Sequence, residues 1–70
     1  MKKYFSAIIE KEGNYYNSLC PELDIASQGK SIDEAIKNLK EAVGLYIEVN
    51  NDAELPTELP IITTMEIEVA

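Results

Sequence analysis

The feature that most constrains this chain is a single amphipathic helix, which the sequence predicts from Ser31 to about Val49. Ser31 and Glu34 have the spacing of a capping box, in which each side chain accepts a hydrogen bond from the N–H of the other residue. Behind them, apolar residues recur at steps of three and four, so they share one face of a helix. The turn-forming run Asn50-Asn51-Asp52 predicts the end of the helix. The apolar face consists of Ile32, Ala35, Ile36, Leu39, Ala42, Val43, Tyr46 and Ile47.

Three segments before the helix have the pattern of strands. Residues 4–10 alternate between two faces, and residues 15–20 are rich in strand-forming side chains. Glu12-Gly13-Asn14 supplies a turn between them, because Gly and Asn tolerate a positive φ. Pro21 lacks an N–H and ends the second strand. Residues 25–28 predict a short third strand.

The segment after the helix also ends in a strand pattern. Its first part contains the pairs Leu55-Pro56 and Leu59-Pro60, and each proline removes a backbone donor and fixes φ. Residues 63–69 then alternate, with Met65, Ile67 and Val69 on one face and Glu66 and Glu68 on the other. We therefore expect an irregular connection followed by a fourth strand.

The predicted order is β-β-β-α-β in one α+β domain that covers residues 1–70. Three antiparallel strands in sequence form a meander, and a right-handed crossover through the helix brings the fourth strand beside the first. The expected fold is a four-stranded mixed sheet of order 3-2-1-4 with one helix on one face. Its other face has nothing in this chain to cover it.

Length and composition narrow the class of protein. Seventy residues leave room for one core only, and 46% hydrophobic residues are ordinary for a globular protein. Cys20 is the sole cysteine, so it has no internal disulfide partner, which favours a reducing compartment. The apolar run after Lys2-Lys3 stops at Glu10-Lys11-Glu12, too early for a signal peptide, and no segment reaches the length of a membrane span. We expect a soluble, cytoplasmic protein without membrane contact.

The net charge of −7 lies in the second half of the chain. Residues 1–40 contain all six lysines and six acids, whereas residues 41–70 contain seven acids and no base. A negative field of this kind repels phosphate backbones and favours a basic partner. Nucleic-acid binding is therefore not expected.

Several short motifs, taken in order, resemble the HicB family of antitoxins. The similarity spans roughly residues 4–69, and the order and spacing of the motifs carry it, including the Leu-Pro pairs before the last predicted strand. The motifs are Gly13-Asn14-Tyr15-Tyr16, Cys20-Pro21-Glu22-Leu23, Gln28-Gly29-Lys30-Ser31, and the run from Glu34-Ala35 to Lys40-Glu41-Ala42.

The resemblance implies a partial ribonuclease-H-like fold and a function. HicB proteins bind and silence HicA, a small basic RNA-cleaving toxin, and many carry a further C-terminal DNA-binding domain. This chain ends at Ala70, directly after the fourth predicted strand. We therefore expect an antitoxin-like module that neutralises a HicA-like toxin without binding DNA directly.

The residues expected to meet the toxin are Glu48, Asp52, Glu54 and Glu58, because they cluster where the helix and the proline-containing connection meet. Each is equally well explained as a solubilising surface charge. The alternative function is an orphan homo-oligomeric domain that binds a small molecule or an unrelated protein, with no catalytic activity.

The uncovered sheet face predicts self-association. It carries Tyr4 and Ile8, with Tyr15 or Tyr16 added according to the strand register. Apolar patches of a few hundred Å² usually mark interfaces in small proteins. We expect a symmetric dimer or a tetramer formed from two dimers, through this face or its edge strand.

No catalytic, cofactor or metal site is expected. The chain has no histidine, so it lacks the commonest general base and zinc ligand. Cys20 has no histidine or nearby lysine to lower its pKa, which favours a packing role. A two-metal nuclease site needs converging carboxylates, and we do not expect Glu10, Asp24 and Glu48 to converge. Gly44, in the middle of the predicted helix, is expected to mark close packing against a neighbour.

Overall fold

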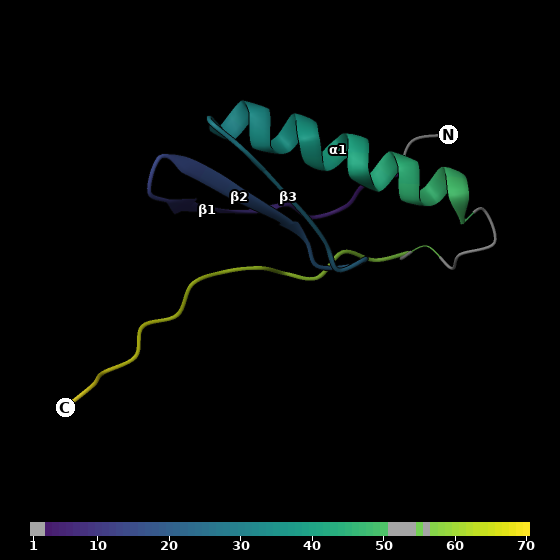
Figure 1. Cartoon of the computed structure of the whole chain (residues 1–70). Helices are drawn as coiled ribbons and strands as arrows, with labels where there is room; N and C mark the ends of the chain where they lie inside the picture. Colours follow the sequence, from purple (N-terminus) through teal and green to yellow (C-terminus); the bar gives the residue numbers. More distant parts are fainter. Residues whose placement is uncertain (1–2, 51–54, 56) are drawn as a thin grey trace.

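The computed structural model describes residues 3–50, 55 and 57–70, and places three strands and one helix among them (Figure 1). The strands form one antiparallel sheet of order β1-β2-β3. The helix lies across one face of the sheet, mainly over β3 and β2. The elements are β1 (Ile8–Glu12), β2 (Tyr15–Cys20), β3 (Ile25–Gly29) and α1 (Ile32–Val49).

The hairpin turn fixes the register of the sheet. A two-residue loop joins β1 to β2, and its first residue, Gly13, has a φ of 59°. Glycine at this position suits the tight turns whose twist matches antiparallel strands. The resulting register sets Ile8 opposite Leu19 and Leu19 opposite Ala26. Since a shift of one residue would exchange the two faces, this pairing decides which side chains meet α1.

The core lies between α1 and the helix-facing side of β2 and β3. Cys20, Leu39 and Val43 are buried together, and the half-buried side chains of Phe5, Leu23, Ile25 and Ile47 pack around them. The Ser18 hydroxyl is also buried, and it donates a hydrogen bond of 3.0 Å to the carbonyl oxygen of Ala35. The bond matters because an unpaired buried hydroxyl is costly.

Both ends of α1 are capped by their own side chains. The N–H of Glu34 donates to the Ser31 hydroxyl at 3.1 Å, as the sequence predicts. The return bond differs by one residue, because the Glu34 carboxylate accepts from the N–H of Lys30 at 3.0 Å rather than from that of Ser31. Asn50 caps the other end, and its N–H donates to the carbonyl of Tyr46.

The predicted fourth strand and the four-stranded sheet of order 3-2-1-4 are wrong. Residues 57–70 are exposed and pair with no strand of the described chain, and the sheet has three antiparallel strands. Figure 1 shows this segment leaving on the side of the sheet opposite α1. Alternation of side chains reports that a segment suits a pleated surface, but a strand also needs a neighbouring backbone, which alternation does not specify.

The first strand begins later than the pattern predicts, at Ile8 rather than Tyr4. If the register of β1 and β2 is continued, Ser6 falls opposite Pro21, which has no N–H to donate. The N–H of Ser6 instead donates to the carboxylate of Glu22 at 2.7 Å. The regular ladder therefore ends where the proline would enter it.

No helix among the residues that the structure describes has both the length and the apolar character that crossing a bilayer requires.

Two glycines of this fold give opposite predictions for the same substitution. A Cβ on Gly29 would lie 2.5 Å from the backbone nitrogen of Ala35, whereas a Cβ on Gly44 would have no heavy atom within 4 Å. Gly29→Ala should lower the free energy of unfolding by about 1–3 kcal/mol through overpacking. Gly44→Ala should raise it by about 1 kcal/mol through better helix propensity. Urea unfolding followed by circular dichroism measures both, and effects of equal sign would contradict this packing.

Candidate functional site

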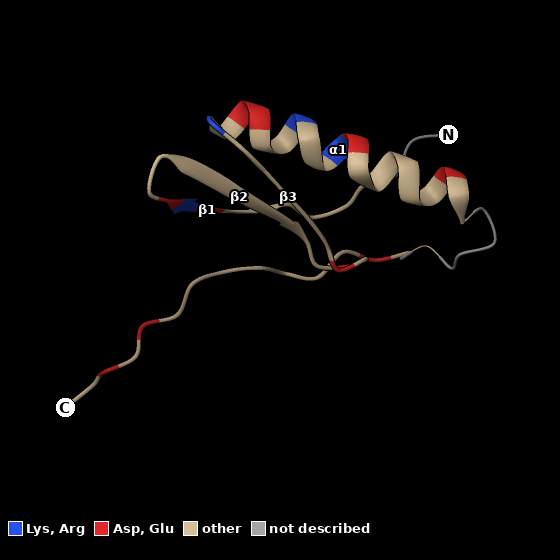
Figure 2. Cartoon of the chain, viewed as in Figure 1, with Lys and Arg blue, Asp and Glu red and all other residues tan. Residues whose placement is uncertain are grey.

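The acidic residues proposed from the sequence to bind a partner are only partly placed by the structure. Glu48 is exposed in the last turn of α1, and Glu58 is exposed in the segment that follows. Asp52 and Glu54 lie outside the described residues. The last turn of α1 contains no basic residue, so the Glu48 carboxylate adds to the negative end of the helix dipole. Figure 2 shows acidic residues without basic ones from this turn to the C-terminus among the residues it colours.

The open face of the sheet contains an apolar row bordered by a polar one. Ile8, Leu19 and Ala26 lie side by side across the three strands, and Glu10, Asn17 and Gln28 form the next row. Together they line a shallow hollow of about 540 Å³. This face is the surface from which the sequence predicts self-association.

The register separates the four residues predicted for self-association. Ile8 lies in the apolar row, and Tyr15, opposite Glu12, shares its face and is 46% exposed. Tyr16 lies on the other face, opposite Gly29, so Tyr15 is the tyrosine of the hairpin that belongs to the open face. Tyr4 is 73% exposed and precedes β1. No contact with a second chain tests this surface, and it stays a prediction.

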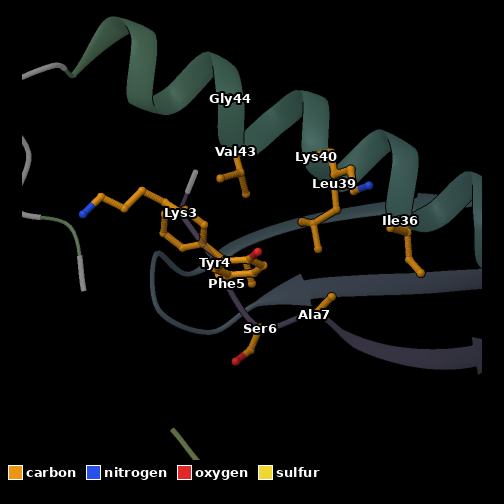
Figure 3. Close-up of a pocket in the computed structure, with 11 residues that line it drawn as sticks. Lys3, Tyr4, Phe5, Ser6, Ala7, Ile36, Leu39, Lys40, Val43 and Gly44 are labelled. Carbon is orange, nitrogen blue, oxygen red and sulfur yellow. The ribbon is translucent and has the colours of Figure 1, made fainter. Parts of the chain in front are cut away.

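A second hollow, which we call the helix-edge groove, was missed by the sequence reasoning. It has a volume of about 570 Å³ and lies between residues 3–7 and one flank of α1. Figure 3 shows Leu39 and Val43 pointing from α1 toward the segment that carries Tyr4 and Phe5. Its lining is apolar apart from Ser6 and two lysines, and consists of Lys3, Tyr4, Phe5, Ser6, Ala7, Cys20, Ile36, Leu39, Lys40, Val43 and Gly44.

Gly44 belongs to this groove and does not mark close packing, which corrects the expectation from the sequence. It is exposed, and a Cβ built on it would meet open space. Its missing side chain therefore widens the groove at the edge of α1 within the single chain.

Glu22 is a further residue that sequence reasoning did not single out. One of its carboxylate oxygens accepts from the Ser6 N–H at 2.7 Å and from the Cys20 thiol at 3.5 Å. The other oxygen is buried without a hydrogen-bond partner among the described residues. Desolvation raises the pKa of the Glu22 carboxyl, but the hydrogen bonds from Ser6 and Cys20 outweigh it and hold this pKa below its usual value. Its signals in the sequence were its place directly after the proline that ends β2 and its membership of the Cys20-Pro21-Glu22-Leu23 motif.

Cys20 occupies the core, with a side chain that is 1% exposed. Desolvation raises the pKa of its thiol, and the hydrogen bond to the Glu22 carboxylate and the charge of that carboxylate raise it further. A buried thiol that keeps its proton is a poor nucleophile. The packing role that the sequence favours for this residue agrees with its position.

The carboxylates considered for metal binding are dispersed. Glu10 lies on the open sheet face, Asp24 in the turn before β3 and Glu48 at the end of α1, and all three are exposed. In the described ranges, no three Asp, Glu or Cys side chains are grouped so that they would hold a metal ion.

Comparison with known proteins finds relatives that share one family name. A UPF0150 protein of Helicobacter pylori strain J99 is 41% identical over 66 residues, which cover 89% of this chain and 92% of that protein. A UPF0150 protein of Archaeoglobus fulgidus is 42% identical over 52 residues, which cover 71% of this chain and 75% of the relative. A UPF0150 protein of Synechocystis is 44% identical over 46 residues, or 63% and 58% of the two chains. No family model matches the chain.

The environment of Cys20 predicts slow thiol chemistry. In the native protein, an aromatic disulfide reagent should react with Cys20 about a hundredfold or more slowly than in the urea-unfolded chain, because reaction requires the core to open. Absorbance of the released thiolate gives both rates. Comparable rates in the two states would show that the thiol is accessible.

The environment of Glu22 predicts a pH-dependent stability. Because the folded-state pKa is lowered, its stabilisation is present above the unfolded-state pKa of about 4.3 and is lost as the pH falls through the folded value. Glu22→Gln should therefore destabilise the protein at neutral pH, and the difference should vanish in strong acid, where both side chains are neutral. Urea unfolding across this pH range measures it. Glu41→Gln, an exposed change on α1, is the control, and an equal pH dependence there would contradict the assignment.

Proposed function

The chain belongs to the UPF0150 protein family, and we propose that this member is an antitoxin-like module that binds and neutralises a small basic RNA-cleaving toxin of the HicA type. The proposed action is non-catalytic and takes place in the cytoplasm. The chain acts by covering the surface with which its partner meets RNA. The resemblance to HicB proteins in the sequence motifs suggests this partner, and the charge distribution supports it.

The observation that carries the proposal is the one-sided charge. All six lysines lie in residues 1–40, and residues 41–70 hold seven acids with no base. Within the described part of this region the acids are exposed, at Glu41, Glu48, Glu58, Glu66 and Glu68. Complementary fields of this kind speed association with an oppositely charged protein and disfavour nucleic acid. An RNA-cleaving protein needs a basic surface, which matches this field.

The end of α1 holds one of these acids, Glu48, on a well-positioned backbone. Glu48 stands on a helix that is held on the sheet by the buried residues Leu39 and Val43, so its backbone is well positioned. The free carbonyl groups of the last turn add a partial negative charge near its carboxylate. We propose Glu48 and Glu58, with Asp52 and Glu54 from the connection, as the toxin-facing set.

Motifs that carry the resemblance to HicB proteins also have definite structural tasks here. Gly29 allows β3 to pass the start of α1, Ser31 caps this helix, and Glu22 satisfies the N–H of Ser6. These motif residues therefore stabilise the packing of the helix on the sheet. The proposed toxin binding rests on the acidic residues instead.

A binding measurement tests the proposal. The chain should form a stable complex with a small basic protein encoded beside its gene, and calorimetry should give an affinity that weakens as salt is raised. The double variant Glu48→Gln, Glu58→Gln should weaken binding about tenfold, equivalent to about 1.4 kcal/mol. Absence of a complex with the product of either neighbouring gene would refute the toxin-binding role.

The matched control removes the same charge from the hairpin. Glu10→Gln with Glu12→Gln changes the net charge equally, but on β1, away from the last turn of α1. It should leave the affinity within about twofold, because screened charges distant from an interface contribute little. An effect as large as that of the first pair would show that total charge, and not this surface, governs binding.

The alternative function, a homo-oligomeric domain with a different partner, is favoured by another observation. The part of the chain that the structure describes leaves a hollow on the open sheet face, lined by Ile8, Leu19 and Ala26, and the helix-edge groove, lined by Ile36 and Val43. Uncovered apolar surfaces on so small a domain favour association. The two functions are compatible, because the acidic surface and the apolar hollows use different residues.

A further inference from the structure

We propose that the helix-edge groove receives residues 63–69 of a second copy of this chain, and that two chains exchange these segments to form a symmetric dimer. Within one chain the sheet remains three-stranded, and the added strand comes from the partner copy. The inference concerns the purified chain alone and does not depend on toxin binding.

The first observation is the free edge of β1. This strand pairs only with β2 among the described elements, so its outer N–H and C=O groups are available to a further strand. The residues before it continue this edge along the groove, with Phe5 and Ala7 among the lining side chains. An extended peptide that pairs with such an edge gains backbone hydrogen bonds as well as side-chain contacts.

The second observation is the apolar flank of α1. The helix packs on β3 and β2, and one of its flanks faces the segment of residues 3–7 that leads into β1. Ile36 and Val43 line the groove from the side of α1, as Figure 3 shows. A Cβ on Gly44, beside them, would have no heavy atom within 4 Å. The groove thus offers both an edge to pair with and an apolar surface to cover.

The third observation is the segment itself. Met65, Ile67 and Val69 are 82%, 63% and 83% exposed, an unusual state for three apolar side chains that alternate along one segment. Their spacing of two places them on one face of an extended chain, with Glu66 and Glu68 on the other. As a strand beside β1, this segment would turn its apolar face toward α1 and its glutamates toward solvent.

Charge favours this occupant over others. Among the described residues the groove is lined by Lys3 and Lys40 and by no acid, whereas the segment carries two glutamates and no base. A strand from a basic partner would be repelled by the two lysines, so the acidic segment of a second copy is the better match. In the described structure the segment of the same chain runs away from the groove, on the side of the sheet opposite α1 (Figure 1).

Exchange between two copies closes the assembly. Each chain offers one groove and one segment, so a two-fold axis relating the chains satisfies both grooves and leaves none open. The predicted self-association is then realised at the edge strand and the groove, with Tyr4 at the contact, and it does not require the open face.

Two variants test the two sides of the contact separately, one in the groove and one in the segment of residues 63–69. Gly44→Glu fills the groove with a charged side chain and should leave the chain folded, because a Cβ there meets nothing and helix propensity improves. Ile67→Asp puts a charge on the apolar face of the segment and changes no residue of the core. Gly44→Ala is the small control. Circular dichroism verifies that each variant keeps its helix.

Light scattering and sedimentation then measure the mass in solution of the unaltered chain and of each variant. The unaltered chain and Gly44→Ala should have twice the 7.8 kDa mass of one chain at micromolar concentration. Gly44→Glu and Ile67→Asp alone should each have the mass of one chain, with the dissociation constant raised at least tenfold. An equimolar mixture of these two variants should recover dimers, because it retains one intact groove and one intact segment.

Three results would overturn the proposal. An unaltered chain of 7.8 kDa at all concentrations would exclude the dimer. Variants that remain dimeric would place the contact elsewhere, for instance on the open face at Ile8 and Leu19. A mixture that stays monomeric, with each variant monomeric alone, would show that the segment of one chain does not pair with the groove of the other.

Discussion

The close approach of α1 to β2 and β3 at Ala35 is the contact on which the rest of this structure depends. Ala35 is fully buried, and Gly29 has no side chain at the point where β3 passes the backbone of Ala35. The Ser18 hydroxyl bonds the carbonyl of Ala35 from β2. Small residues and one satisfied polar group thus let the helix lie close to the sheet, and this closeness brings Leu39 and Val43 over Cys20.

Within the described residues, the same contact leaves the other face of the sheet and the edge of β1 without a covering helix. Because α1 lies over β2 and β3, it leaves the edge of β1 and its own outer flank without a neighbour in the described chain. The helix covers only one face of the sheet, and on the opposite face Ile8 and Leu19 are half-buried and Ala26 is exposed. A chain of 70 residues has few elements with which to cover such surfaces, so other chains are the natural candidates. No acidic residue is among the described residues that line the helix-edge groove.

The predictions that rest on short-range signals were reliable. The Ser31 cap, the apolar stripe of the helix and the Gly13 turn each act through neighbours a few residues away, and each is present in the structure. The candidate acids Glu48 and Glu58 are exposed, as expected for polar residues that do not belong to the apolar stripe. What they bind stays a prediction. The local sequence pattern predicts that a side chain is exposed, but it does not identify a binding partner.

Long-range features could not be predicted in the same way. The helix-edge groove arises because α1 packs mainly on β3. The helical spacing of Ile36 and Val43 predicts that they face the sheet, but it does not predict over which strands the helix lies. The hydrogen bond between Ser6 and Glu22 joins residues sixteen positions apart around Pro21. The sequence alone determined the helix, the hairpin and the strand-like alternation of residues 63–69, because these follow from backbone preferences and side-chain spacing. Only the tertiary structure decided that this last segment has no neighbour in its own sheet, since strand pairing is a relation between two backbones.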